Sequence, residues 1–324
     1  MNFRSVAQLS DQLLVWSRAL PKDFEVIVGV PRSGLLAANL LAMYRNLPLT
    51  DVEGLLEGRV FDSGLRARRT QVSLATHREV LVLDDSVNTG DTIRSVRERI
   101  ATANLPHEVH YAAVYIQPHR DNLVDYYYEI LNQPRVFEWN ILHGQLLKTV
   151  CLDLDGVLCF DPKARENDDG EEYLRFLDTA QPLLKPSKKV GWIVTSRLEK
   201  YREATERWLD RSGISYGELV MMDYPDAPTR RSLLARSAFK AEVYRRTGAS
   251  LFMESSLQQS FEIANLAGRD VLCVGTMQLV RPGVSPLLRP VFRADDVHPP
   301  SVARRLARKV IPERARSRIL GLTS

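Results

Sequence analysis

The sequence has 324 residues, 44% of them hydrophobic and 26% charged, and a formal net charge of +4. This length is enough for two domains with sizeable cores. The longest apolar runs are too short to span a membrane, and Cys151, Cys159 and Cys273 predict neither a disulfide framework nor a zinc site. We therefore expect a cytoplasmic protein.

The first half of the chain begins with an alternation of helical and strand patterns. Residues 4–20 have the apolar spacing of an amphipathic helix. Phe24–Val30 is an apolar run typical of a buried strand, and it ends in the tight sequence Pro31–Gly34. An apolar helix over Leu35–Tyr44 is expected next.

Val80–Leu83 predicts a second buried strand, and two acids, Asp84 and Asp85, stand where it is expected to end. A turn of small and hydroxylated residues follows, and a helical pattern then runs to Ile100. A strand, a loop and a helix N-terminus form a natural phosphate site. Adjacent carboxylates would repel phosphate but accept hydrogen bonds from ribose hydroxyls, so the pattern indicates a ribose phosphate ligand.

This stretch resembles the phosphoribosyl pyrophosphate motif of type I phosphoribosyltransferases. The resemblance implies that Asp84 and Asp85 hold the ribose 2- and 3-hydroxyls. Asp91 stands where a small residue is common, so its carboxylate must point away from the phosphate. The residues implied to cradle the 5-phosphate are Asn88, Thr89, Gly90, Asp91 and Thr92.

Two further loops fit the same family. Arg32, Ser33 and Gly34 correspond to the loop that binds pyrophosphate through backbone N–H groups and a basic side chain. The polar, arginine-rich stretch Gly54–Thr70 resembles a mobile loop that closes over pyrophosphate. A solvated hairpin is the alternative for this stretch, because most charge runs are simply exposed.

Another strand is expected at His110–Gln117, and the aromatic-rich stretch Asp125–Asn140 follows it. Its tyrosines and tryptophan could form a hood over the acceptor site and stack on a sugar or base. They could equally belong to the core, as aromatic clusters usually do.

The second half of the chain begins with another apolar strand pattern, Val150–Leu158, which contains alternating acids at Asp153 and Asp155. One carboxylate can then point into a site while the other swings over it from the following turn. A carboxylate nucleophile, a neighbouring acid/base and Mg²⁺ are the components of aspartyl-phosphate chemistry.

The stretch resembles the first motif of haloacid dehalogenase-type phosphohydrolases, and later motifs follow in order. The resemblance implies a phosphate-binding Thr195 at the end of a strand and a charge-neutralising Lys240. Glu254, where Asp is usual, would bind Mg²⁺ together with Asp153 and Asp155, although Ser255 stands where a second acid is frequent. The implied catalytic residues are Asp153, Asp155, Thr195 and Lys240.

The spacing of these motifs predicts the architecture. The segment between Asp155 and Trp192 is too short for a capping domain, so we expect an open, capless phosphatase. The fold class is α/β, with two doubly wound parallel-sheet domains. We place the phosphoribosyltransferase domain at 1–145, the phosphatase-like domain at 146–297 and a basic amphipathic tail at 298–324.

The net positive charge of the chain comes from its tail. Residues 301–324 contain seven Lys/Arg and one Glu, so the other 37 basic and 39 acidic residues sum to −2. An anionic membrane surface is one partner that suits this segment, and it would place the protein at the inner face of the membrane. A solvated tail is the alternative, and nucleic acid is not expected because no aromatic residue interleaves.

The two domains together suggest reactions in series: ribose 5-phosphate is attached to an acceptor, and its phosphate is then removed. This order resembles the bifunctional ribofuranosyltransferases of bacterial surface polysaccharide assembly. The resemblance implies phosphoribosyl pyrophosphate as donor and a glycan, lipid-linked, as acceptor. The alternatives are a nucleobase phosphoribosyltransferase fused to a nucleotidase, and a non-catalytic phosphoribosyl pyrophosphate sensor. The intact Asp153, Asp155 and Lys240 argue against the sensor.

Overall fold

A computed structural model of the chain describes residues 1–61, 74, 77–167, 169–223 and 233–284. Its internal contacts divide the chain into two compact units, the first containing Arg4–Arg135 and the second beginning at Val136. A two-stranded sheet of β1 (Asn2–Arg4) and β7 (Arg135–Phe137) is also present. Most of the expected closing loop and the whole basic tail lie outside the described residues.

The first unit is a five-stranded sheet in the order β3-β2-β4-β5-β6, and all neighbouring strands are parallel. The strands are β2 (Val26–Gly29), β3 (Leu49–Asp51), β4 (Glu79–Val87), β5 (Glu108–Ile116) and β6 (Tyr126–Ile130). The helices are α1 (Val6–Ala19), α2 (Gly34–Arg45), α3 (Val52–Leu56) and α4 (Asp91–Thr102), with a 3-10 turn at Asp121–Leu123.

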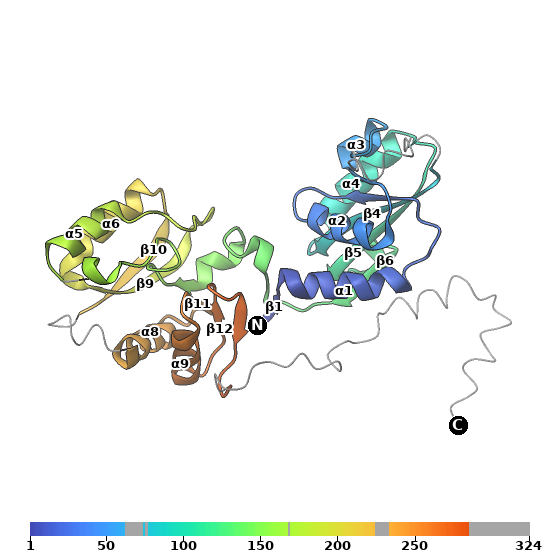
Figure 1. The fold of residues 1–324 in the computed structure, drawn as a ribbon. Helices are drawn as coiled ribbons and strands as arrows, with labels where there is room; N and C mark the ends of the chain where they lie inside the picture. The colour runs from blue at the N-terminus through green and yellow to red at the C-terminus, as the bar shows by residue number, and fades with distance from the viewer. Residues whose placement is uncertain (62–73, 75–76, 168, 224–232, 285–324) are drawn as a thin grey trace, which may run out of the picture. The chain divides into compact units, whose positions relative to one another are not determined.

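Helices cover both faces of this sheet (Figure 1). The hydroxyl of Ser5 accepts the N–H of Gln8, whose side chain accepts the N–H of Ser5, and this capping box starts α1. Helix α1 packs on α2, which packs on β2 and β4. On the other face, Val80 and Val82 of β4 share a core with Ile93 and Val96 of α4.

The second unit is a six-stranded sheet in the order β10-β9-β8-β11-β12-β13, in which only β13 is antiparallel to its neighbour. The strands are β8 (Val150–Leu152), β9 (Val190–Leu198), β10 (Tyr216–Met222), β11 (Leu251–Glu254), β12 (Val271–Cys273) and β13 (Gln278–Val280). The helices are α5 (Glu171–Thr179), α6 (Arg202–Arg211), α8 (Leu233–Thr247) and α9 (Leu257–Ala267). Short 3-10 turns occur at Glu138–Asn140, Gln145–Thr149, Ala164–Glu166 and Glu199–Tyr201.

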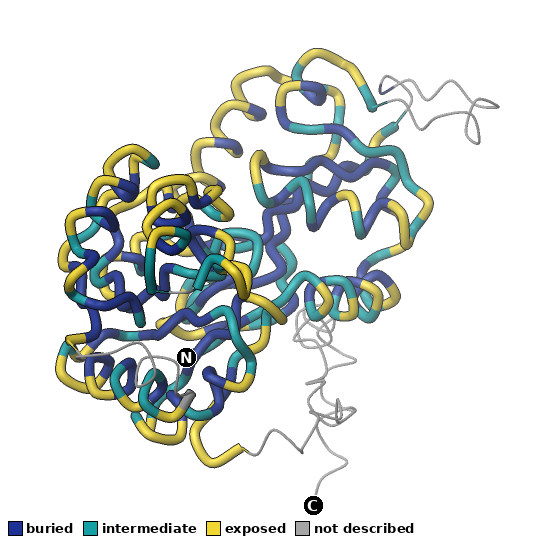
Figure 2. Tube along the Cα trace, turned by 60° about the vertical axis from the view of Figure 1, so that its left-hand side comes forward, coloured by how far each residue is buried: buried dark blue, intermediate teal, exposed yellow. Residues whose placement is uncertain are grey.

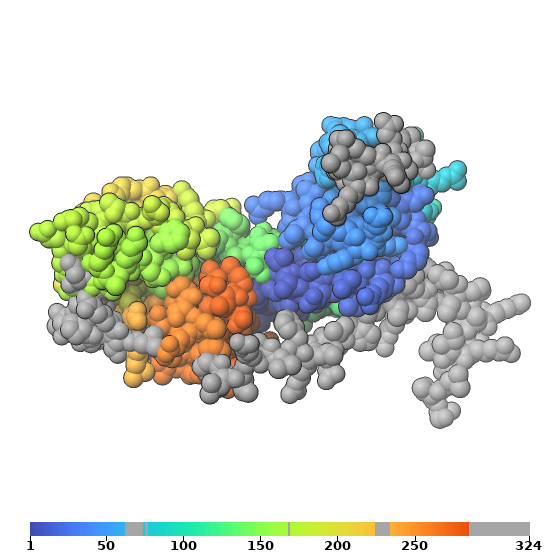
Figure 3. Space-filling model, viewed as in Figure 1, coloured from blue at the N-terminus to red at the C-terminus, as the bar shows by residue number. Residues whose placement is uncertain are grey.

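This sheet also lies between two helical layers. Val150 and Leu152 share a core with residues of α5 and α6, whereas Cys151 between them packs with residues of α8 and α9. Figure 2 shows buried strands inside and helices with exposed outer faces. In Figure 3 the green residues that include α5 and the orange residues of the α8–β13 part occupy separate areas of the unit's surface.

The predicted α/β class with parallel sheets is confirmed, but two strand ends differ from the prediction. Strand β4 does not end at Leu83: it continues through both acids to Val87, because β5 is equally long and keeps pairing with it. Strand β8 ends at Leu152, because the carbonyl of Leu154 accepts N–H groups from the next turn.

The described residues between β8 and β9 form a 3-10 turn and α5, with no inserted domain among them. None of the helices that the structure describes is both long enough and apolar enough to cross a membrane.

Candidate active sites

Asp84 and Asp85 lie near the carboxyl end of β4, the central strand of the first sheet, and both are buried. The backbone N–H of Asp85 donates to Oδ1 of Asp84 at 2.8 Å. Burial and the adjacent Asp85 carboxylate raise the pKa of Asp84 well above its usual range. Ionisation of both carboxyl groups of this pair therefore costs free energy.

The expected pyrophosphate loop lies directly against these acids. Strands β2 and β4 are neighbours, and the N–H of Val30 donates to the carbonyl of Leu83 at 3.0 Å. Helix α2 begins at Gly34, where an added Cβ would lie 2.9 Å from Oδ1 of Asp84. Only glycine allows this approach, and the exposed Arg32 and half-buried Ser33 come immediately before it in the sequence.

The expected phosphate loop follows β4. Gly90 is buried and left-handed, with φ 90°, while Asn88, Thr89, Asp91 and Thr92 are exposed around it. A Cβ on Gly90 would lie 2.2 Å from Cδ1 of Leu123, a side-chain end that can shift, so it is the left-handed backbone angle that favours glycine here. The loop ends at the N-terminus of α4, where backbone N–H groups face outward for an anion.

The Asp91 carboxylate is turned toward protein donors. Its Oδ2 accepts the Thr89 hydroxyl at 2.6 Å, and its Oδ1 accepts Nη2 of Arg94 at 2.6 Å. The Thr89 and Arg94 hydrogen bonds lower the pKa of Asp91 below its usual range. Its partners are a hydroxyl of the loop and a side chain of α4, and its direction relative to a bound phosphate stays a prediction.

Two side chains near this loop were not identified from the sequence. Asn88 Oδ1 accepts Nε2 of Gln117 at 2.6 Å, and Nη2 of Arg135 donates to the Val87 carbonyl at 3.1 Å. Burial lowers the pKa of Arg135, and the charge of Asp85 opposes that decrease. Arg135 thus brings positive charge to the acids from a distant segment whose local sequence carries no motif.

The tyrosines of the expected acceptor hood pack inside the first unit. The ring of Tyr126 lies 5.7 Å from that of Phe24, and the ring of Tyr128 lies 6.1 Å from that of Trp16. Tyr127 packs against the core that includes α4. These contacts favour the core interpretation for all three tyrosines.

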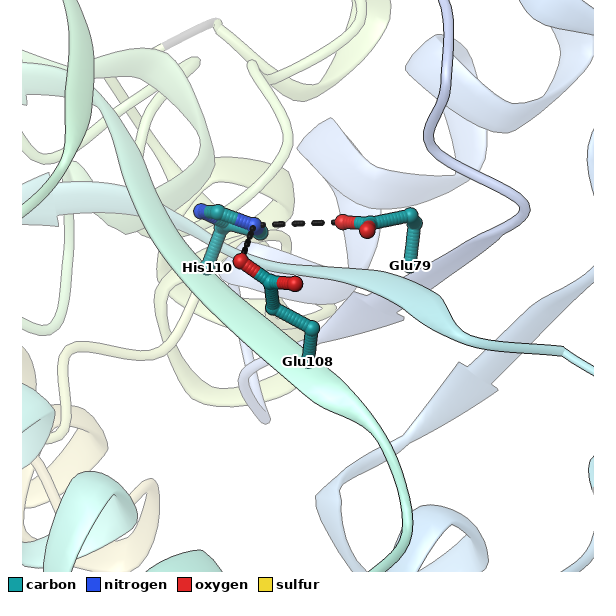
Figure 4. A group of neighbouring side chains, drawn as sticks. All are labelled: Glu79, Glu108 and His110. Carbon is teal, nitrogen blue, oxygen red and sulfur yellow. Dashed lines mark hydrogen bonds and ion pairs between the residues drawn. The ribbon is translucent and has the colours of Figure 1, made fainter. Parts of the chain in front are cut away.

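A histidine–carboxylate cluster lies at the opposite end of the same strands (Figure 4). Nε2 of His110 is 3.2 Å from Oε2 of Glu79 and 3.6 Å from Oε1 of Glu108. Glu79 and Glu108 are the first residues of β4 and β5, whereas Asp84 and Asp85 approach the other end of β4. The cluster is therefore separate from the candidate site.

The second site is built on three adjacent strands, β9, β8 and β11. Nζ of Lys240 lies 2.8 Å from Oδ2 of Asp153 and 2.7 Å from Oε2 of Glu254, and all three side chains are buried. Burial and the Glu254 charge raise the pKa of Asp153, while Lys240 opposes the rise. Burial opposes the charged form of Lys240, but the two carboxylates outweigh it and raise its pKa.

Asp155 is held by a buried arginine, Arg197, to which the motif comparison gave no role. Arg197, whose side chain is 0% exposed, places Nη2 at 2.6 Å from Oδ1 of Asp155 and Nε at 3.1 Å from Oδ2. Burial alone would raise the pKa of Asp155, but the charge and hydrogen bonds of Arg197 lower it below its usual range. Cys159 also lies within 3.3 Å of Oδ1, and burial raises the pKa of its thiol.

The structure places Ser196 rather than Thr195 at the cavity. Thr195 is fully buried, and its hydroxyl oxygen accepts the N–H of Arg197 at 3.2 Å. The cavity has a volume of about 210 Å³. It is lined by Asp153, Asp155, Asp161, Pro162, Asn167, Tyr173, Ser196, Arg236, Lys240, Ser255 and Gln259.

Carboxylate oxygens of this cavity fit a hard divalent cation such as Mg²⁺. Glu254 is less available than expected, because Oε1 accepts the N–H groups of Ser255 and Ser256 while Oε2 accepts Lys240. Asp161 lies close by: a Cβ on Gly156 would be 2.9 Å from its Oδ2. Burial and the charges of Asp155 and Glu254 raise the pKa of Asp161, which indicates crowded negative charge.

Comparison with known proteins finds relatives of the first unit. Residues 4–146 match the family model described as a phosphoribosyl transferase domain. Xanthine-guanine phosphoribosyltransferase of Chromohalobacter salexigens is 33% identical over 127 residues, which are 38% of this chain and 68% of that protein. The match to the family model includes both loops around Asp84 and Asp85.

Two solved structures are also similar in part. Purine phosphoribosyltransferase from Pyrococcus horikoshii is 23% identical, with a TM-score of 0.30. Helicobacter pylori xanthine-guanine-hypoxanthine phosphoribosyltransferase is 14% identical, with a TM-score of 0.33. Each similarity covers 43% of this chain and 92% of the other chain.

Proposed function

Because the chain belongs to the phosphoribosyltransferase family through residues 4–146, we propose that it carries out two reactions in series. The first unit transfers ribose 5-phosphate from phosphoribosyl pyrophosphate, and the second unit removes the 5-phosphate. The observation that carries this proposal is a separate set of buried carboxylates on each of the two parallel sheets. We assign the two activities to domains 1–145 and 146–297.

In the first reaction, Asp84 and Asp85 accept hydrogen bonds from the ribose hydroxyls. The loop over residues 88–92 and the N-terminus of α4 hold the 5-phosphate. Arg32, Ser33 and Gly34 hold the pyrophosphate, which leaves through an oxocarbenium-like state. The acceptor hydroxyl then attacks C1 of the ribose.

In the second reaction, the Asp153 carboxylate attacks the phosphorus and forms an aspartyl phosphate. Lys240 neutralises charge beside the nucleophile. Asp155 donates a proton to the leaving hydroxyl and then accepts a proton from the attacking water. Mg²⁺ held by Asp153 and Asp155 would stabilise the phosphoryl oxygens. Because Arg197 favours the ionised form of Asp155, proton uptake requires this contact to loosen.

We propose a glycan hydroxyl, on a lipid carrier, as the acceptor. Removal of the 5-phosphate makes ribosylation irreversible and leaves a ribofuranosyl residue in a bacterial polysaccharide. The basic segment 301–324, outside the described residues, would support contact with anionic lipid at such an acceptor.

A nucleobase acceptor is the second candidate, since the relative from Chromohalobacter salexigens is named for xanthine and guanine. The second unit would then act as a nucleotidase. A non-catalytic sensor is disfavoured because Asp153, Asp155 and Lys240 are all present and Lys240 contacts Asp153.

Incubation of the full-length protein with phosphoribosyl pyrophosphate, Mg²⁺ and either lipid-linked glycans or a nucleobase panel distinguishes the candidates. We expect a glycan to gain the mass of one ribosyl residue while pyrophosphate and phosphate are released together. A nucleoside product would establish the second candidate instead. Pyrophosphate release without phosphate release from any product would contradict the reaction series.

A further inference from the structure

The buried cations of the phosphatase-like site are already matched by carboxylates. Lys240 contacts Asp153 and Glu254 within 2.8 Å, and Arg197 contacts Asp155. A phosphomonoester carries close to two negative charges at neutral pH. Positive charge beyond these two residues, from the proposed Mg²⁺ and from any further side chain at the cavity, would therefore favour its binding beside Asp153.

Arg236 is the remaining cation among the residues that line the cavity. It lies on α8 four residues before Lys240, so both side chains project from the same face of the helix. Its Nε is buried and has no hydrogen-bond partner among the residues that the structure describes. A buried guanidinium donor without an acceptor is costly, which points to an acceptor supplied by a ligand.

A second, independent group in the same cavity shows the same feature. The hydroxyl of Ser196 lines the cavity from β9, is buried, and also lacks a hydrogen-bond partner within the described part of the chain. Arg236 and Ser196 come from different elements and both face the space above Asp153 and Asp155. Two such donors around one small polar cavity suit a tetrahedral oxyanion.

We propose that Arg236 binds the phosphoryl oxygens of a phosphomonoester seated in this cavity, with Ser196 donating to the same group. The inference rests on the proposed phosphatase function of the second unit. The planar guanidinium can donate two parallel hydrogen bonds to phosphate, which the ammonium of a lysine cannot reproduce. Arg236 is thus a substrate-binding residue distinct from the charge-neutralising Lys240.

The test compares Arg236→Gln and Arg236→Lys with Arg245→Gln in the full-length protein with Mg²⁺. Arg245 is a matched control because it lies on the same helix, is exposed and pairs with Glu242. The measured quantities are kcat and KM for p-nitrophenyl phosphate and the inhibition constant of inorganic phosphate. We expect Arg236→Gln to raise both KM and the inhibition constant about tenfold to a hundredfold, with a smaller change in kcat.

Arg236→Lys should give an intermediate value, Ser196→Ala a smaller increase, and Arg245→Gln wild-type constants. Unchanged KM and phosphate inhibition in Arg236→Gln, with hydrolysis intact, would overturn the inference and leave the proposed function standing. A variant that loses thermal stability but binds phosphate normally would also overturn it, because Arg236 would then contribute only to folding. A wild-type protein that neither hydrolyses nor binds phosphate would refute the proposed phosphatase itself.

Discussion

The two carboxylate pairs of this chain are arranged in opposite ways. Asp84 and Asp85 are consecutive residues of one strand, and the charge of Asp85 helps to raise the pKa of Asp84. Asp153 and Asp155 alternate after a strand, and each contacts a buried cation, Lys240 or Arg197. The first pair concentrates negative charge, whereas the second pair is largely neutralised.

This difference fits the two ligands that we propose. Neutral ribose hydroxyls are donors, and two adjacent carboxylates offer them several acceptor oxygens. A phosphate is itself an anion, so a nucleophilic carboxylate can accept it only where nearby cations offset the repulsion. The same residue type therefore serves two chemistries because of its surroundings.

The largest effect that separates the pairs is expected from Asp153→Asn. Removal of the nucleophile prevents the aspartyl phosphate, so phosphate release should fall by at least about a thousandfold. Transfer should continue, and the acceptor should accumulate one phosphate heavier than the normal product by mass spectrometry. Asp85→Ala is the mirror variant, in which pyrophosphate release stops and hydrolysis persists. Unmodified acceptor with Asp153→Asn would contradict the reaction order.

The Arg197→Met variant tests the ion pair between Arg197 and Asp155 in the second site. This change leaves Asp155 without its cation, and breaking a buried ion pair costs about 3–5 kcal/mol of folding free energy. The double variant with Asp155→Asn should recover most of that loss. Because folding lowers the pKa of Asp155, the pair stabilises the fold above the unfolded pKa, and this contribution disappears as pH falls through the folded pKa.

Chemical denaturation of these variants measures the effect. Arg175→Met is the control, since Arg175 pairs with Glu171 and Glu172 on the exposed face of α5 and should change stability by less than about 1 kcal/mol. Equal losses in the free energy of unfolding for Arg197→Met and Arg175→Met would mean that the charge of Arg197 does not stabilise Asp155.

Local patterns predicted the strands that carry the motif acids, because strand burial and loop chemistry are encoded in consecutive residues, but they did not predict β3 or β6. The length of β4 was not predictable, since it depends on pairing with β5. Arg135 and Arg236 also reach their sites through tertiary packing, so no local spacing marks them. Ser196 instead of Thr195 faces the cavity because strand register decides which neighbour points outward.

Gly34→Ala tests how closely the pyrophosphate loop must approach the first pair. The new Cβ would meet Oδ1 of Asp84 at 2.9 Å and the backbone oxygen of Leu83 at 3.0 Å, and the backbone cannot move away cheaply. We expect a loss of about 1–3 kcal/mol in stability and weaker binding of the donor. At Gly144 the nearest atom would be 3.9 Å away, so Gly144→Ala is the control. A fully active Gly34→Ala variant in a donor-binding assay would show that the loop and acids act independently.

The smallest effect concerns stability and has an unusual sign. Folding raises the pKa of Asp84 through burial and the Asp85 charge, so the folded state binds this proton more tightly than the unfolded state. Its contribution to stability is then most favourable below the unfolded pKa of about 3.9 and is lost as pH rises through the folded pKa. At pH 7 this carboxyl group therefore opposes folding, and Asp84→Asn should raise the melting temperature of the first unit while it abolishes transfer. The gain should shrink toward pH 4. Asp91→Asn is the control with the opposite sign, because the Thr89 and Arg94 hydrogen bonds lower the pKa of Asp91.

Calorimetry at pH 7 and pH 4 measures these changes in melting temperature. If the Asp84→Asn protein melts at a lower temperature than wild type at pH 7, the charged form of the first pair is stabilised by partners, as that of the second pair is.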